Sequence, residues 1–304
     1  MAMASPAPTD VLLRPAAIAR AWMGPGRPQE TIAVPGVVLG PGEALLRVDL
    51  ATIAEDDLAV ADGDEECPAP TVLGREFVGR VAALGGRVDA ADGTALELGE
   101  RVVCAPRPRE RIAAHRELVG GFATHVHVPA GTPIVRVGEV LPACILAPVP
   151  GVVSRVAGLL REAEQRVDLE DVDLTVTGAG IDPLVLAAMA TERGAAVTIA
   201  SADPRVRSRA HRFGAAVIAE RAAVRGLRAT VRPRHDVGGA FTVVAPDCAP
   251  ADLATAVAFM RSLGTRRYPF ADLVSAPLPL DRLDEAIGLA RSGAFLRVAI
   301  APGA

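Results

Sequence analysis

The sequence predicts an α/β protein in two parts, a β-barrel followed by a sheet with helices packed on it. At roughly 100–200 residues per domain, 304 residues predict about two domains. The first half consists of short β-type runs separated by Gly, Pro and Asp, whereas after Pro150 strand-like runs alternate with helical ones. Hydrophobic residues make up 50% and charged residues 22%, a balance typical of globular proteins.

The expected barrel strands are rich in β-branched residues and end at turn residues. They cover residues 31–34, 44–50, 77–84, 101–105 and 122–128. Two polar stretches between them, residues 89–99 and 106–120, are expected to be surface loops.

In the second half, the hydrophobic period alternates between that of a helix and that of a strand. Helices are expected at residues 152–165, 183–193 and 205–213, the last closed by Gly214, and strands at 174–177, 196–200, 215–219 and 241–244. Such alternation predicts a parallel sheet with right-handed crossovers. The chain then closes with helices at 253–263 and 283–292 and a strand at 296–300.

Charge and composition exclude several classes of protein. The net charge is −4 and the arginines are scattered, so we expect no nucleic-acid partner. No apolar run approaches the roughly 18 residues of a membrane helix, and the N-terminus lacks the pattern of a signal peptide, so a cytoplasmic location is expected. The four cysteines form no C-x-x-C pair, which predicts reduced thiols.

A glycine turn marks the expected nucleotide site. Gly178 and Gly180 lie between a predicted strand and a predicted helix, where glycines let the backbone approach a pyrophosphate. With Ile181 and Asp182 they form the expected phosphate-binding turn. Two features count against binding: Pro183 replaces the third glycine, and Asp182, the expected N-cap, would repel a pyrophosphate. Alternatively, Asp182 simply caps the helix of a retired site.

The end of the next strand predicts the cofactor preference. Ser201 stands where a carboxylate would hold the 2′-hydroxyl of NAD, followed by Asp203 and Arg205. A small neutral residue followed by arginines suits a 2′-phosphate, so NADP is favoured over NAD. The alternative is that these arginines only form a solvated helix face.

Four segments together carry a family resemblance. Residues 71–81 (TVLGREFVGRV), 98–103 (LGERVV) and 120–130 (GGFATHVHVPA), with the glycine turn, resemble the medium-chain dehydrogenase/reductase family of zinc-type alcohol dehydrogenases. The resemblance implies a GroES-like β-barrel catalytic domain, residues 1–150 completed by 270–304, and a truncated Rossmann domain, residues 151–269. Residues 120–137 look closest to the phosphonate-associated branch.

The sequence differs from that family at the zinc-ligand positions and in its length. Where the family has its catalytic zinc ligands, this chain has Ala54, Arg75 and, near the third position, Ala147. No further cysteine follows Cys104 in the structural-zinc lobe, so neither zinc is expected. Roughly 50–60 residues are also expected to be missing after the fourth Rossmann strand.

Arg75 and Glu76, with Asp57 nearby, are the expected catalytic residues. A cation at the metal position would polarise a carbonyl oxygen during hydride transfer. Alternatively, Arg75 fills the vacated pocket and pairs with Glu76, Asp56 or Asp57. Tyr268, as the only tyrosine, is a weaker candidate proton donor, and His125 and His127 share a strand face without a third ligand.

The resulting hypothesis is a zinc-independent, NAD(P)H-linked oxidoreductase acting on a small alcohol or carbonyl compound, in specialised or phosphonate-related metabolism. The alternative is a catalytically silent homologue that serves as a binding or partner subunit. Partners are therefore a small-molecule substrate and either a second copy in a homodimer or a related dehydrogenase in a hetero-oligomer.

Overall fold

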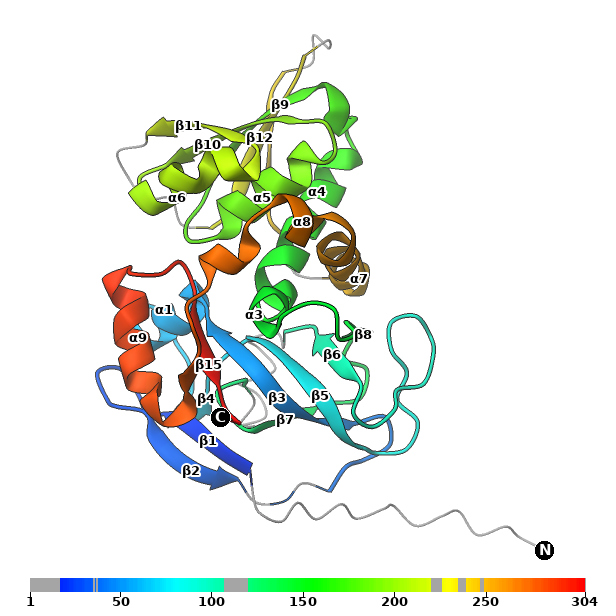
Figure 1. The fold of residues 1–304 in the computed structure, drawn as a ribbon, viewed down its shortest axis with the longest axis vertical. Coiled ribbons are helices and arrows are strands. Elements are labelled where there is room, and N and C mark those ends of the chain that lie inside the picture. Colours follow the sequence, from blue (N-terminus) through cyan, green and yellow to red (C-terminus); the bar gives the residue numbers. More distant parts are fainter. Residues whose placement is uncertain are drawn as a thin grey trace, which may run out of the picture.

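The protein forms two lobes, seen one above the other in the computed structural model (Figure 1). The structure describes residues 17–34, 36, 38–106, 120–219, 226–234, 239–246 and 249–303. Three sheets organise these residues: a three-stranded and a seven-stranded sheet in one lobe, and a five-stranded sheet in the other. Residues 107–119, including His115, and also His235 and Cys248, lie outside the described residues.

The first lobe is built mainly from antiparallel strands around one core. Its larger sheet has the order β14-β15-β3-β5-β6-β8, with β7 paired to β3, and its smaller sheet has the order β2-β1-β4. The strands are β1 Ala17–Trp22, β2 Glu30–Val34, β3 Ala44–Ile53, β4 Thr71–Val72, β5 Glu76–Leu84, β6 Arg101–Cys104, β7 His125–Val128 and β8 Ile134–Arg136. Helix α1, Glu55–Asp62, directly follows β3.

The end of the chain returns to this first lobe. Strand β14, Leu278–Pro279, pairs with β15, Val298–Ala301, and β15 pairs antiparallel with β3 through Val298 and Ile53. Helix α9, Leu283–Ser292, lies between them in sequence and buries Leu283, Ala286 and Ile287. The pairing brings Arg297, just before β15, beside the start of α1.

The second lobe begins with three parallel strands in the order β11-β10-β9, covered by helices. These elements are β9 Val172–Thr177, α5 Asp182–Thr191, β10 Ala196–Ser201, α6 Pro204–Arg209 with a 3-10 turn to Phe213, and β11 Ala215–Ala219. Gly214, with φ of 81°, ends that turn as expected. Further helices are α7 Pro250–Phe259 and the short α8 Thr265–Arg267.

The other half of this sheet differs from the expected parallel arrangement. Strand β12, Arg228–Pro233, runs antiparallel to β9, and β13, Phe241–Val244, runs antiparallel to β12. The sequence pattern did not indicate β12, because arginine and proline at its ends hide a short strand in which only Ala229 and Val231 are buried. The sheet is therefore mixed, while its first three strands keep the expected nucleotide-fold order.

A long helical segment links the lobes. It comprises α3 Ala143–Leu146, a π-helical stretch Val149–Val153 and α4 Ser154–Glu164. The segment from Ala143 to Glu164 has the length and apolar composition to cross a membrane, although no apolar run of that length was expected. Because 78% of its most apolar window is buried inside the protein, it is the core helix of this fold.

Candidate active site

The glycine turn joins β9 to α5 at the boundary between the lobes. Gly180 has φ of +59°, a conformation that favours glycine, and α5 begins at Asp182. The expected cap is wrong in detail: Ile181 is the N-cap residue and no side chain caps the helix. Asp182 is the first helical residue, and its carboxylate binds arginines instead.

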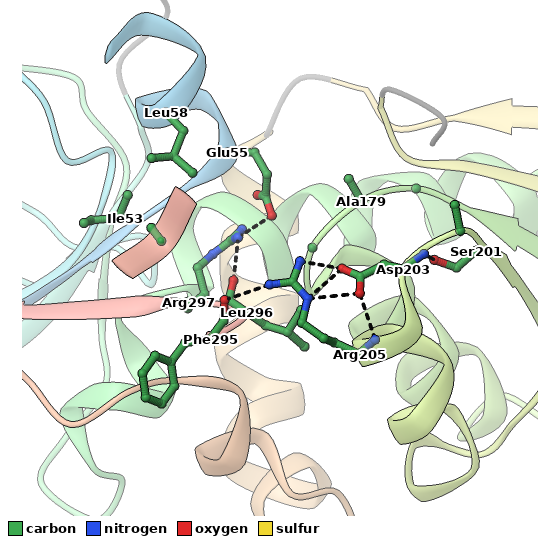
Figure 2. A pocket seen from close by; sticks show the side chains of 14 residues that line it. Ile53, Glu55, Leu58, Ala179, Ser201, Asp203, Arg205, Phe295, Leu296 and Arg297 are labelled. Carbon is green, nitrogen blue, oxygen red and sulfur yellow. Dashed lines mark hydrogen bonds and ion pairs between the residues drawn. The ribbon is translucent and has the colours of Figure 1, made fainter. Parts of the chain in front are cut away.

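A cavity of about 220 Å³ opens at this turn, with residues from both lobes in its wall (Figure 2). One side is formed by residues 178–180 and 201–203 with Arg205, and the other by Ile53, Glu55, Leu58, Ala290 and residues 295–297. The expected turn residues Gly178 and Gly180 and the expected strand-end residues thus line one cavity. Ile181 and Asp182 are buried just beyond it.

Glu55 fills the space over the glycine. A Cβ atom built on Gly180 would lie 1.6 Å from Glu55 Oε1 and 2.6 Å from its Cδ, so the carboxylate lies directly on the face of this residue. Arg297 Nη1 donates a 2.6 Å hydrogen bond to the same oxygen, Oε1 (Figure 2). With Glu55 in this position, a phosphate group does not fit over Gly180.

Arg297 is the centre of a buried charge cluster. Its side chain is 1% exposed, and besides Glu55 it contacts Glu76 at 3.2 Å through Nε and Asp182 at 3.8 Å through Nη2. Thr52 Oγ1 donates to Glu76 Oε2 at 2.9 Å. Arg155 Nη2 donates to Asp182 Oδ2 at 2.8 Å. The cluster thus places three carboxylates around two guanidinium groups.

Burial shifts the ionisation of the cluster. Loss of water raises the pKa of Glu76 to about 7, against the opposing pull of Arg297. Burial also raises the pKa of Asp182, although Arg155 opposes the shift. Burial disfavours the charged form of Arg297, but Glu55 and Glu76 outweigh it and hold its pKa above the usual value. The guanidinium therefore stays charged while Glu76 titrates near neutral pH.

The two other expected catalytic residues lie outside this cluster. Arg75 Nη1 binds Asp56 Oδ2 at 2.8 Å, so of the three carboxylates considered Asp56 is its partner, and Glu76 pairs with Arg297 instead. Asp57 accepts hydrogen bonds from the backbone N–H groups of Ala54 and Gly74, both at 2.9 Å. Because both of its oxygens serve the backbone, Asp57 holds the start of α1 rather than facing a substrate.

The residues at the zinc positions do not fit a metal. Ala54 and Ala147 offer no ligand atom, and the guanidinium of Arg75 is itself a cation. Over the described part of the chain, no group of three or more His, Cys, Asp or Glu side chains is arranged to hold a metal ion. No chemical step is therefore assigned to zinc.

The strand-end residues form a closed local network. Ser201 is the last residue of β10, and its hydroxyl accepts from the backbone N–H of Asp203 at 3.1 Å. Arg205 Nη2 binds Asp203 Oδ2 at 2.6 Å, and despite partial burial Arg205 keeps the pKa of Asp203 below its usual value. A 2′-phosphate approaching Arg205 would therefore also meet the Asp203 carboxylate.

The sequence patterns did not indicate three residues of the cluster: Arg297, Glu55 and Arg155. Arg297 lies 221 residues from Glu76 in the chain, and only the β15–β3 pairing brings the two together. The local signal for Arg297 was its position directly before the apolar run 298–300, where a charge that becomes buried needs a partner.

The remaining candidates have other partners. Tyr268 is buried, and its hydroxyl donates to Glu192 at 2.7 Å, far from the glycine turn in sequence and outside the residues that line the cavity. His127 pairs with Glu43 at 3.1 Å and His125 contacts Thr124 at 3.2 Å, both on the strand β7 side of the barrel. These side chains serve local packing.

Comparison with known proteins finds similarity to alcohol and threonine dehydrogenases. Residues 40–139 match the alcohol dehydrogenase GroES-like domain family. An L-threonine 3-dehydrogenase from Anaeromyxobacter dehalogenans is 30% identical over 189 residues, 57% of this chain and 51% of that protein. The chain thus spans about half the length of the curated relatives it matches.

Solved structures extend the likeness in fold to nearly the whole chain. An alcohol dehydrogenase from Thermotoga maritima matches with a TM-score of 0.74 and 16% identity, over 94% of this chain and 99% of that one. Acetophenone reductase from Geotrichum candidum, in complex with NAD, matches with a TM-score of 0.69 and 17% identity, over 95% and 98% of the two chains. The predicted GroES-like and Rossmann-type architecture is confirmed. Residues 40–139 thus form an alcohol dehydrogenase GroES-like domain, and nearly the whole chain shares the fold of the solved alcohol dehydrogenase.

Proposed function

We propose that this protein is a nicotinamide-dependent oxidoreductase that acts on a small alcohol or carbonyl compound without catalytic zinc. The buried Arg297 cluster beside the glycine turn carries the proposal. It places a permanent cation in the wall of the cavity, paired with Glu55 and Glu76, and these two residues directly follow Ala54 and Arg75 in the sequence. Dehydrogenase relatives and an NAD-bound structural neighbour support the cofactor class.

In this proposal Arg297 takes the role first expected of Arg75. Arg297 lines the cavity, and its buried Nη2 makes no hydrogen bond, its nearest described carboxylate oxygen being Asp182 Oδ1 at 3.8 Å. We propose that this guanidinium is the group that faces a substrate oxygen. A fixed cation stabilises the negative charge that develops on a carbonyl oxygen when hydride arrives. The bound nicotinamide would supply that hydride. Arg75, which is bonded to Asp56, does not line the cavity.

Glu76 and Thr52 act through Arg297 as positioning residues. Glu76 binds the Nε side of the guanidinium, and Thr52 in turn holds the Glu76 carboxyl. Nη2 lies 3.8 Å from Asp182 Oδ1, so the two buried carboxyls fix the plane of the guanidinium. We further propose that residues 1–150 with 270–304 form the catalytic domain, and that residues 151–269 form a shortened nucleotide-binding domain.

In this proposal NADP is favoured over NAD, because β10 ends at Ser201, a small neutral residue, where a carboxylate would hold the 2′-hydroxyl of NAD. Titration of the purified protein with NADPH and with NADH tests both points. Nucleotide fluorescence gives the Kd, and a ligand at 100 times its Kd stabilises the native state by about 2.7 kcal/mol. Saturable binding supports the proposal, whereas no binding of either nucleotide at millimolar concentration rejects it.

One observation favours a second function. The carboxylate of Glu55 occupies the place over Gly180 where a phosphate would lie, as expected if the site no longer binds nucleotide. The protein would then be a catalytically silent subunit that binds a related dehydrogenase or a second copy of itself. Stable co-purification with a full-length dehydrogenase, together with failure to bind nucleotide, would select this function.

A further inference from the structure

Glu55 has an unusual position for an acidic side chain. It is the first residue of α1 in one lobe, yet its carboxylate reaches the glycine turn of the other lobe (Figure 2). Its side chain remains 39% exposed, whereas that of its partner Arg297 is 1% exposed. The Glu55 carboxylate, an anion of the protein itself, therefore lies in the space that the turn leaves open over Gly180.

The surroundings of Glu55 would suit an external anion equally well. Gly180 offers a face without a side chain, and Arg297 offers Nη1, which now binds Glu55. The other terminal nitrogen, Nη2, is buried and lies 3.8 Å from Asp182 Oδ1. A phosphate over Gly180 would need the same space and the same Nη1 donor. The two anions therefore exclude one another by volume and by charge.

Glu55 is also free to leave. Its one hydrogen bond among those described is to Arg297, and its exposure gives the carboxylate a route to solvent. After it leaves, Glu76 still holds Arg297 through Nε at 3.2 Å. The guanidinium would thus remain oriented, and Nη1 would become available to an incoming anion.

We propose that Glu55 is an internal anion that plugs the glycine turn, and that a phosphate-bearing ligand binds by displacing it from Arg297. This proposal rests on the proposed function, since it concerns the same nucleotide site. The proposal accounts for a glycine turn whose space over Gly180 is occupied by the Glu55 carboxylate. It also makes Glu55 a residue that weakens nucleotide binding in the wild-type chain.

The test compares wild type, Glu55→Ala and Glu55→Gln in titrations with NADPH, NADH and inorganic pyrophosphate. Asp62→Asn is the matched control, because Asp62 lies on the same helix, pairs with Arg291 and gives the same change of net charge. We expect Glu55→Ala to bind NADPH or NADH at least tenfold more tightly than wild type, and Asp62→Asn to stay within twofold of wild type. Thermal unfolding of each variant verifies that it is folded.

The outcomes separate the plug from the proposed function. Tighter binding by both Glu55 variants, with or without measurable binding by wild type, supports the plug. If wild type binds nucleotide and Glu55→Ala binds it equally well, the plug is wrong and the oxidoreductase proposal stands. If no folded variant binds either nucleotide, both proposals are overturned. An equal gain in Asp62→Asn would attribute the effect to net charge and would also overturn the plug.

Discussion

Replacing Glu76 with glutamine tests the charge cluster through its effect on stability. Glu76 is buried with Arg297 and Thr52, and burial raises its pKa to about 7 from an ordinary value of 4.5. The folded protein therefore keeps a proton that the unfolded chain releases between about pH 4.5 and pH 7. Stability due to this group is present at low pH and is lost as the pH rises through that window.

The size of the effect follows from the shift. One pKa unit corresponds to about 1.4 kcal/mol, so the interval between 4.5 and about 7 corresponds to about 3 kcal/mol. Glutamine resembles the protonated carboxyl in shape and lacks its titration. We therefore expect the free energy of unfolding of Glu76→Gln minus that of wild type to increase by about 3 kcal/mol between pH 4.5 and pH 8, so that the variant becomes relatively more stable as the pH rises.

Urea denaturation followed by tryptophan fluorescence provides the assay. Trp22 is the only tryptophan and is buried in the same lobe as Glu76, so its emission reports unfolding of that lobe. The difference between the two proteins cancels the titration of all groups that they share. A difference that changes by less than about 1 kcal/mol over this range would show that Glu76 is ionised at an ordinary pKa, and would refute the reasoning.

Three further substitutions have defined outcomes. Arg297→Met leaves buried carboxylates without a counter-ion and should cost about 3–5 kcal/mol in urea denaturation, whereas Arg27→Met, at the exposed pair with Glu30, should cost about 1 kcal/mol or less. Gly180→Ala should cost at least about 2 kcal/mol, because its φ is +59° and its Cβ would push the Glu55 carboxylate away from the buried Arg297. Gly93→Ala, with φ of +78° and open space around it, should cost about 1 kcal/mol, and equal losses would contradict the close approach of Glu55. Tyr268→Phe removes one hydrogen bond and should cost about 1 kcal/mol without changing turnover, and a large loss of turnover in a kinetic assay would restore Tyr268 as a proton donor.

Local patterns in the sequence predicted most of the fold. Strand β11 at Ala215–Ala219, strand β13 at Phe241–Val244 and helix α9 at Leu283–Ser292 have the expected bounds, because each has a clear hydrophobic period between turn residues. The antiparallel β12 was missed because its pairing with β9 is decided by tertiary contacts. A short strand with few buried residues carries almost no periodic signal.

The candidate site was less predictable than the fold. The glycine turn and the strand end at Ser201 were located correctly, since both follow directly from the order of strand and helix. The partner of Glu76 could not be found locally, because Arg297 reaches it only through the return of the chain to the first lobe. Arg75, adjacent in sequence to Glu76, points to Asp56 instead, as neighbouring residues of an extended chain face opposite ways.

The central claim is that the arginine–carboxylate cluster around Arg297 takes the place of a catalytic zinc in this cavity. The metal content of the purified protein tests that claim most directly. Elemental analysis would be made after purification in zinc-containing buffer and removal of loose metal, together with nucleotide turnover before and after treatment with a chelator. We expect far less than one zinc per chain and turnover that the chelator leaves unchanged. One tightly held zinc per chain, with turnover lost on its removal and restored on its return, would contradict the claim.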